Sequence, residues 1–213
     1  MNYLKNIIIN HKKSLLILAM TFFLGAKCNK NGSRPCYMST PYNFKVTSTF
    51  SPQKETYSLG DTIYLTSSFP KILTNTTSGQ QVDYSNSLGV GGNLNFGKMD
   101  SLTQDFSNAR NKFSVNVSIG SIEYVDPTWT NILWKENDNN YEFKASIVLL
   151  EKGLFILAIP DLGSQGLRGK NCTNANFGMT VANSNKNLNL FYNAIGYSPD
   201  ALFTKGSYCF RVE

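Results

Sequence analysis

Histidine is almost absent from this sequence. His11 is the single histidine among 213 residues, and it lies in an N-terminal segment that we expect to be removed. The mature chain would then contain none, which excludes Ser-His-Asp and Cys-His catalysis, histidine general bases and histidine metal ligands. Chemistry that relies on carboxylates stays open.

Charged residues are also scarce, at 16% of the chain against a usual ~25%. The net charge of +6 invites a nucleic-acid interpretation. However, Lys5, Lys12 and Lys13 lie in the N-terminal segment, and the rest of the chain holds 17 basic against 14 acidic residues. These basic residues are scattered, whereas nucleic-acid-binding proteins cluster positive charge on one face. We therefore expect no nucleic-acid partner.

The N-terminal segment has the layout of a secretory signal. Residues 1–13 carry basic residues and no acid, and Ser14–Leu24 is an unbroken, mostly apolar run, as such signals require. A helix of that length spans about 16 Å, well short of the ~30 Å hydrocarbon core of a membrane. The alternative is a retained anchor lengthened by Ile7–Ile9, but Lys12 and Lys13 interrupt that stretch.

Two processing routes stay open. Cleavage after Ala26 would make residues 1–26 a signal peptide. Alternatively, Leu24–Cys28 (LGAKC) resembles a degenerate bacterial lipobox with Cys28 as the lipidated residue, followed by a polar tether of the kind found in Bacteroidota lipoproteins. The departure is Lys27, where such sequences have Gly, Ala or Ser. Either route predicts an exported protein, secreted or periplasmic in one case and lipid-anchored in the outer membrane in the other.

The four cysteines are Cys28, Cys36, Cys172 and Cys209. An even number in an exported chain predicts two disulfides with three connectivities. We prefer Cys28–Cys36 with Cys172–Cys209, and the second would stabilise the fold by about 3–4 kcal/mol. Lipid on Cys28 would leave Cys36 without that partner. The spacing does not suit a zinc site.

Alternation of apolar and polar residues predicts many short strands. It is clear at Tyr42–Phe50 and Phe113–Ile119, because period-2 alternation indicates a half-buried strand. A final strand is predicted at Tyr208–Val212. Tyr141–Leu150 and Gly153–Ile159 are predicted to form a long hairpin, whose second strand is apolar enough to be covered on both faces. By contrast, Ser101–Ala109 fits a short helix capped by Ser101. Seven to nine strands with little helix favour an all-β antiparallel sandwich.

Two runs resemble immunoglobulin-like domains. Tyr57–Leu65 (YSLGDTIYL) is similar to the run that opens the second strand of bacterial immunoglobulin-like domains. Glu151–Leu157 (EKGLFIL) resembles the Asp-x-Gly-x-Tyr-x-Cys stretch of immunoglobulin folds, with Leu157 where those have Cys. With the leader, the chain resembles exported immunoglobulin-like β-sandwich proteins of Bacteroidota. No low-complexity linker separates two halves, so we predict one sandwich domain over residues 42–213 after a cysteine-bearing leader at 27–41. The resemblance implies no activity.

The two tryptophans are the first candidate site. Trp129 and Trp134 flank a turn, where exposed rings could stack on sugars in a glycan-binding module. The alternative is that they fill the core, as large aromatics usually do. Glu136–Asn140 is rich in oxygen but lacks the ligand order of a calcium loop, so it is interpreted as a polar turn.

A glycosidase would need two acids facing each other about 5 to 9.5 Å apart. The sequence spacing singles out no pair, and the acids are interpreted as turn and strand-edge residues: Asp83, Asp100, Asp105, Asp126, Glu123, Glu136 and Asp161. We therefore expect no catalytic, cofactor or metal site. The predicted function is a non-enzymatic envelope or secreted module that acts through protein or surface contacts, with glycan binding as the alternative and a carboxylate glycosidase third.

Overall fold

The structure is a computed structural model that describes residues 42–213 except 101–102, 104, 126–129, 184–185 and 197–204. Contacts divide the chain into Met1–Cys36 and Tyr37–Glu213, and every described residue belongs to the second unit. The predicted signal peptide, the leader with Cys28 and Cys36, Asp126 and Trp129 lie outside the described residues. The predicted domain boundaries therefore stay predictions.

The described residues form three sheets. The largest has ten strands: β1 (Tyr42–Ser51), β3 (Thr62–Pro70), β6 (Gly91–Asn93), β9 (Phe113–Ile119), β10 (Ser121–Tyr124), β11 (Thr130–Leu133), β12 (Lys135–Glu136), β13 (Asn140–Leu149), β15 (Leu162–Ser164) and β16 (Ala175–Val181). The second has β2 (Thr56–Tyr57), β7 (Asn95–Asp100), β8 (Asp105–Asn108), β14 (Gly153–Ala158) and β17 (Ser207–Val212). The third pairs β4 (Ile72–Thr74) with β5 (Gln81–Asp83). The helical elements that the structure gives in full are a 3-10 turn at Arg110–Lys112 and α2 (Leu188–Ile195).

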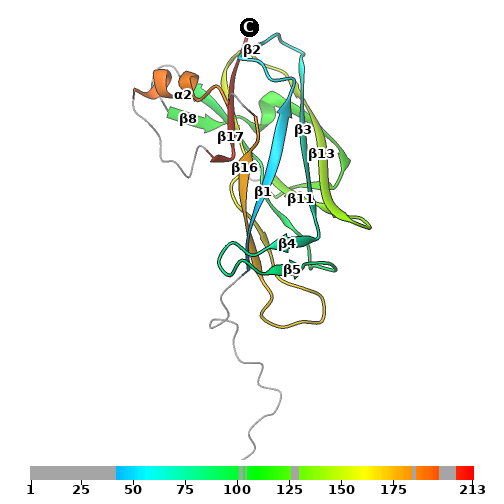
Figure 1. Cartoon of the computed structure of the whole chain (residues 1–213). Helices are drawn as coiled ribbons and strands as arrows, with labels where there is room; N and C mark the ends of the chain where they lie inside the picture. Colours follow the sequence, from blue (N-terminus) through cyan, green and yellow to red (C-terminus); the bar gives the residue numbers. More distant parts are fainter. Residues whose placement is uncertain (1–41, 101–102, 104, 126–129, 184–185, 197–204) are drawn as a thin grey trace, which may run out of the picture. The chain divides into compact units, whose positions relative to one another are not determined.

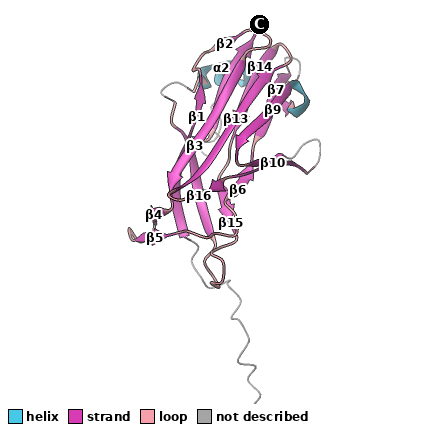
Figure 2. Cartoon of the chain, turned by 90° about the vertical axis from the view of Figure 1, so that its right-hand side faces the viewer, coloured by secondary structure: helices cyan, strands magenta, loops and turns pink. Residues whose placement is uncertain are grey.

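The strand order explains the layers. In the large sheet it is β10-β11-β6-β15-β16-β1-β3-β13-β12, with β9 also paired to β13, and in the second it is β2-β17-β14-β7-β8. Buried residues of both sheets, such as Phe143 and Ile147 in β13 and Phe155 in β14, belong to one core cluster. The sheets therefore pack face to face, and the predicted β-sandwich is confirmed (Figure 2). The described strands outnumber the predicted seven to nine because several are short.

β1 joins two parts of the large sheet. Its alternation buries Phe44, Val46 and Phe50, as predicted. Its first seven residues pair in parallel with β16, and its last three pair antiparallel with β3 (Figure 1). β2 and β17 form a second parallel pair. Most strand pairs are therefore antiparallel, as predicted, whereas the β1–β16 and β2–β17 pairs are parallel and were not predicted.

The predicted hairpin between β13 and β14 is wrong, although both strands exist. β13 pairs with β3, β9 and β12, whereas β14 pairs with β17 and β7 in the other sheet. The turn that joins them carries the chain across the sandwich. A short link between two strands does not by itself pair them, because the chain buries more apolar surface by placing them in opposite layers.

α2 covers the outer face of the five-stranded sheet. β14 faces both ways, as predicted for its continuous apolar run: Phe155 and Leu157 point into the main core, while Ile156 packs with Leu190 and Phe191 of α2. Gly196 ends the helix in the left-handed conformation that glycine favours, with φ 74°.

The helix predicted at Ser101–Ala109 is wrong where the structure describes it. Residues 105–108 form β8 beside β7, and Phe106 stacks on Phe191 of α2 with ring centroids 4.8 Å apart. Tertiary packing against α2 decides the conformation here. No helix in the described part of the chain combines the length and apolar character needed to cross a membrane.

Candidate interaction site

Trp134 does not support glycan binding. The residue is 5% exposed, and its ring packs against Phe69 and Phe143 at centroid distances of 6.5 and 5.1 Å. A sugar in solution cannot stack on a ring held in the core. Core filling, the alternative interpretation of the sequence, is therefore correct for Trp134.

Asp100 and Asp105 are two of the acids considered for a facing carboxylate pair. They are directly opposite each other across the β7–β8 pair, and both are exposed. Asp100 accepts a hydrogen bond from the Thr103 N–H at 3.3 Å, and Asp105 accepts one from the Phe106 N–H at 2.7 Å. These contacts match the prediction that such acids are turn residues. No group of three His, Cys, Asp or Glu residues suited to a metal ion occurs among the described residues.

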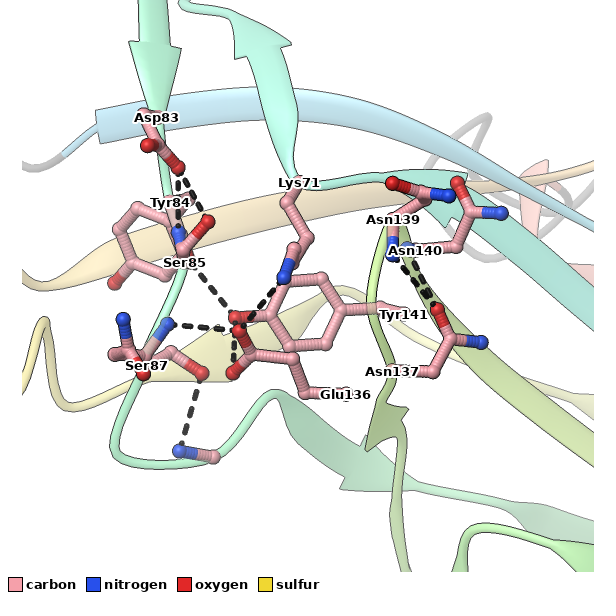
Figure 3. Close-up of polar contacts among 12 residues, drawn as sticks. Lys71, Asp83, Tyr84, Ser85, Ser87, Glu136, Asn137, Asn139, Asn140 and Tyr141 are labelled. Carbon is pink, nitrogen blue, oxygen red and sulfur yellow. Dashed lines mark hydrogen bonds and ion pairs between the residues drawn. The ribbon is translucent and has the colours of Figure 1, made fainter.

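Glu136 lies at the centre of a cluster of polar contacts (Figure 3). Its carboxylate accepts hydrogen bonds from the Asn86 N–H at 2.8 Å and the Tyr141 hydroxyl at 3.1 Å. The Lys71 ammonium lies 3.5 Å away. Tyr141 also lies 2.7 Å from the Tyr84 carbonyl, an alternative acceptor for its hydroxyl. The carboxylate thus ties the loop after β5 to the β12–β13 hairpin.

The electrostatics of this cluster favour a structural role. Burial, with help from neighbouring Glu136, raises the pKa of Tyr141 to about 12, so its hydroxyl stays protonated at neutral pH. The Asn137 side-chain oxygen accepts from the backbone N–H groups of Asn139 and Asn140 at 3.2 and 2.8 Å. The predicted polar turn is confirmed, since this oxygen already serves the turn.

The loop anchored by Glu136 continues to Leu88 and is held on its other side too. The Leu88 N–H donates to the Gly166 carbonyl at 2.7 Å, and the Arg168 N–H donates to the Asn86 carbonyl at 2.9 Å. Ser87 also forms a β-bridge with Leu167. The backbone of this loop is therefore fixed between the β12–β13 hairpin and the β15–β16 connection, and Leu88 is presented in a fixed position.

Leu88 stands at the rim of a shallow groove of about 460 Å³ on the outer face of β6, β11 and β15. We call it the glycine groove, because its lining includes Gly89, Gly91, Gly92 and Gly163; the other lining residues are Leu88, Glu123, Asn131, Ile132, Leu133, Ser164, Gln165 and Ala175. Gly91 pairs directly with both Leu133 and Gly163 across the sheet. At Gly163 the groove surface is exposed backbone, whereas most other strand positions carry a side chain.

Two leucines project from the glycine groove into solvent. Leu88 is 49% exposed and Leu133 is 44% exposed. Leu133 lies across Gly91, since a Cβ at Gly91 would clash with the Leu133 side chain and would lie 2.6 Å from the Ile132 carbonyl oxygen. By contrast, a Cβ at Gly163 would meet nothing within 4 Å. The space above Gly163 is therefore open.

The groove borders the open edge of the large sheet. β10 is the last strand on this side and pairs only with β11 within the described residues (Figure 2). An edge strand presents backbone N–H and C=O groups that a strand from another chain can pair with. Tyr124 and Val125 at its end are 49% and 58% exposed. An apolar rim and an open strand edge thus lie next to each other.

A second and larger cavity, of about 700 Å³, is lined by Lys98, Lys152 and Arg211 near the end of α2. Its positive charge is partly neutralised. Glu151 forms ion pairs with Lys98 and, at 2.5 Å, with Lys112, and Glu213 lies 3.9 Å from Arg211. The hydrogen bonds from Lys112 and Lys98 lower the pKa of Glu151. Because part of its charge is neutralised, this cavity is a weaker candidate than the glycine groove.

The predicted Cys172–Cys209 disulfide is not formed. Cys209 is a free cysteine, 1% exposed, and packs beneath α2 with Ile156 across the β14–β17 pair. Burial raises the pKa of its thiol to about 12. Cys172, in the β15–β16 connection, does carry a disulfide.

The glycine groove cannot be identified from the sequence alone. Neither Leu88, Leu133 nor Gly163 belongs to a motif. One signal was available: Ile132 and Leu133 are consecutive apolar residues in a strand, so one of them must point away from the core. Which strands lie beside β11, and hence what surrounds Leu133, follows only from the topology.

No protein-family description matches the chain, and no curated protein sequence does. The solved structures similar to it include the reeler domain of human F-spondin, with 8% identity and a TM-score of 0.37 over 83% of this chain and 96% of that one. The second type II cohesin module of the adaptor scaffoldin ScaA of Acetivibrio cellulolyticus has 11% identity and a TM-score of 0.35, over 65% and 92%. Type II cohesin A11 of Bacteroides cellulosolvens has 10% identity and a TM-score of 0.25, over 65% and 95%. At these values the likeness carries no argument about function.

Proposed function

We propose that this chain is a non-enzymatic, exported binding module whose glycine groove and β10 edge hold a protein partner. The observation that carries the proposal is the pair of exposed leucines, Leu88 and Leu133, at a groove that has open space above Gly163. Apolar patches on a soluble surface often mark places where proteins meet. Export rests on the N-terminal signal pattern of the sequence.

The groove suits one segment of a partner protein better than a small molecule. Ligand pockets enclose most of their ligand, whereas this groove is shallow and lies along strands. An extended segment could pair with the β10 edge and place an apolar side chain between Leu88 and Leu133. Asn131 and Gln165 add side-chain amides at the lining, and Glu123 adds a negative charge on β10. A partner with apolar and basic side chains would complement these groups.

Preorganisation supports the same proposal. The Leu88 loop is fixed on two sides, by Glu136 and by Gly166, so little conformational entropy remains to be lost there on binding. Interfaces gain affinity when such costs are already met in the free protein.

Site-specific photo-crosslinking in the native host tests the proposal. A photoreactive phenylalanine analogue is introduced as Leu133→p-benzoylphenylalanine, with Leu59→p-benzoylphenylalanine as the matched control. Leu59 is 51% exposed and lies in the β2–β3 turn, outside the groove. We expect an adduct of discrete mass that contains a second protein at position 133 and none at 59.

The Leu88→Asp substitution makes the test specific. It places a charge at the rim without touching the core, so the adduct at position 133 should disappear while the unfolding curve stays nearly unchanged. Adducts of equal yield at positions 133 and 59, or an adduct at 133 that survives Leu88→Asp, would contradict the proposal.

A further inference from the structure

β9 is a long and unprotected edge strand. On one side it pairs with β13, and no other strand of the described residues pairs with it (Figure 2). Its seven residues, Phe113–Ile119, include no charge and no proline. Natural edge strands are usually short or carry charges, because an open edge can pair with another chain. By contrast, β8 and β10 have four residues each and carry Asp105 and Glu123.

The backbone of β9 has groups that point to this open edge. The Asn116 carbonyl accepts a hydrogen bond from the Ser146 hydroxyl of β13 at 3.4 Å. The Lys112 carbonyl, four residues earlier, accepts one at 3.0 Å from the backbone N–H that follows β13. Both carbonyls therefore face β13. Because the backbone groups of successive residues point to opposite edges of a strand, those of Val115 and Val117 face away from β13.

The side chains of β9 alternate between two rows. One row is Phe113, Val115, Val117 and Ile119, and the other is Ser114, Asn116 and Ser118. Val115 and Val117 pack against the main core but are only partly buried, whereas the polar row is exposed. A strand that continued the sheet beyond β9 would cover the part of the two valines that is still in water.

The sequence of β9, FSVNVSI, reads nearly the same in both directions about Asn116. Two copies that pair antiparallel about this residue place Val115 of one copy opposite Val117 of the other, and the two Asn116 residues opposite each other. The outer pairs match as well, serine with serine and phenylalanine with isoleucine. No like charges meet, which would destabilise such a pair. A two-fold interface needs this self-complementarity, since it uses the same patch on both subunits.

We propose that a second copy of this chain binds along β9, by antiparallel pairing of the two β9 strands about a two-fold axis at Asn116. Val115 of one copy and Val117 of the other exchange both of their backbone hydrogen bonds, as paired residues in such ladders do. The register of the β9–β13 pair shifts between Lys144 and Ala145, just beyond Val117, so the ladder is short. The interface therefore belongs to the small, reversible class. It is separate from the glycine groove, because no lining residue of the groove belongs to β9.

Disulfide trapping in the full chain, exported by a bacterial host, tests the position of the axis. Asn116→Cys places two thiols opposite each other, with Cα atoms about 4.5 Å apart, a separation that a disulfide spans. Ser114→Cys is the matched control on the same exposed row, since its two copies would lie about 13 Å apart along the strands. With oxidised glutathione, we expect a disulfide-linked dimer from Asn116→Cys on a non-reducing gel. Ser114→Cys and the parent should remain almost wholly single chains.

Equal cross-linking at the two positions, or none in Asn116→Cys, would overturn the proposal. Sedimentation equilibrium over a series of concentrations gives the parent's state without any cross-link. The mass should rise with concentration toward twice that of one chain. A parent that sediments as a single chain throughout would also overturn the proposal.

Charge at the axis provides a readout that a folding defect cannot mimic. Asn116→Lys and Asn116→Asp each bring two like charges together, so each variant alone should sediment as a single chain. An equal mixture of the two should regain the dimer, because opposite charges then meet across the axis. Asn116 is exposed, so the unfolding curves of both variants should stay nearly unchanged. A mixture that remains monomeric would refute the pairing about Asn116.

The groove variant Leu88→Asp separates this proposal from the proposed function. It should dimerise like the parent, whatever protein the groove binds, because Leu88 lies outside β9. Loss of the dimer in Leu88→Asp would place the second copy on the glycine groove and would contradict the assignment to β9.

Discussion

On the outer face of the five-stranded sheet, α2 covers Ile156 and Cys209 with Leu190 and Phe191. On the outer face of the ten-stranded sheet, Leu88 and Leu133 project into solvent beside bare glycines. Both faces belong to the same sandwich, and both carry apolar side chains. In one case the chain supplies its own cover, and in the other the described residues supply none.

This difference separates a face that stabilises the fold, under α2, from a face that we propose binds a partner, at the glycine groove. Burying an apolar side chain stabilises a fold by roughly 1.5–3 kcal/mol, so the face under α2 contributes to folding. The leucines of the glycine groove contribute little, because about half of each side chain stays in water. Substitutions on this surface should cost little stability, so its side chains can be adapted to a binding partner. The four predictions below test that separation.

The largest effect is expected from removing the cover. Phe191→Ala deletes the ring stacked on Phe106 and opens a cavity above Cys209, so the free energy of unfolding should fall by about 3 kcal/mol. Urea denaturation measures the loss, and native-state thiol labelling should find Cys209 newly reactive. Leu59→Ala, at an exposed site, should stay within about 0.5 kcal/mol of the parent. Unchanged protection of Cys209 would contradict the role given to α2.

The floor of the groove should show an intermediate effect. Gly91→Ala places a methyl group 2.6 Å from the Ile132 carbonyl oxygen, and such overpacking should cost about 1–3 kcal/mol. Gly163→Ala is the matched control, since its methyl group meets nothing within 4 Å, and it should be nearly neutral. Chemical denaturation of the two variants side by side decides the matter. Equal losses would show that the floor is not shaped by close packing at Gly91.

Glu151 near the basic cavity should have a smaller effect that depends on pH. Hydrogen bonds from Lys112 and Lys98 lower its pKa below the ordinary value of 4.5, so its contribution is complete above that pH and is lost as the pH falls through the lowered value. Glu151→Gln should therefore cost less than about 1 kcal/mol at pH 7, because the carboxylate is partly exposed. Denaturation at pH 7 and at acid pH should show the difference shrinking on acidification. A difference independent of pH would contradict this account.

The smallest effect on stability is expected at the groove rim. Leu133→Ala should change the free energy of unfolding by less than about 0.5 kcal/mol, because its side chain is already 44% exposed. The neighbouring Ile132→Ala, at a fully buried position, should cost about 2–5 kcal/mol. Thermal or chemical denaturation checks both. If Leu133→Ala destabilised the fold as strongly as Ile132→Ala, the rim would be part of the core after all.

Local sequence pattern predicted most strands, but it did not predict which strands pair with each other in the sheets. The alternation of Phe44, Val46 and Phe50 identified β1, and the apolar run of β14 identified a strand covered on both faces. Pairing depends on topology instead, so the sequence could not show that β13 and β14 lie in different sheets. Ser101–Ala109 favoured a helix because its apolar spacing also fits one. The contact of Phe106 with Phe191, distant in sequence, decides for a strand.

The candidate site could not be predicted from local sequence pattern for the same reason. The sequence drew attention to Trp134 because aromatic residues near turns can bind sugars, but the core takes that ring. The glycine groove is assembled from β6, β11 and β15 and from the Leu88 loop, which come from separate parts of the chain. Its glycines carry no side chain to form a motif. Cysteine counting predicted disulfides, while only the burial of Cys209 showed which pairing fails.

The parallel pairing of β1 with β16 has a consequence for the order of folding. Tyr42 and Ala175 are Cα partners, and at the end of this ladder the Asn183 side chain binds the backbone of Phe50, 133 residues away in sequence. The hydrogen bonds along one edge of β1 can therefore form only after β16, which is much later in the sequence, has been synthesised. Such long-range contacts make folding slow, commonly milliseconds to seconds. A chain that crosses a membrane from its N-terminus would complete its sandwich only when almost all of it has arrived on the far side.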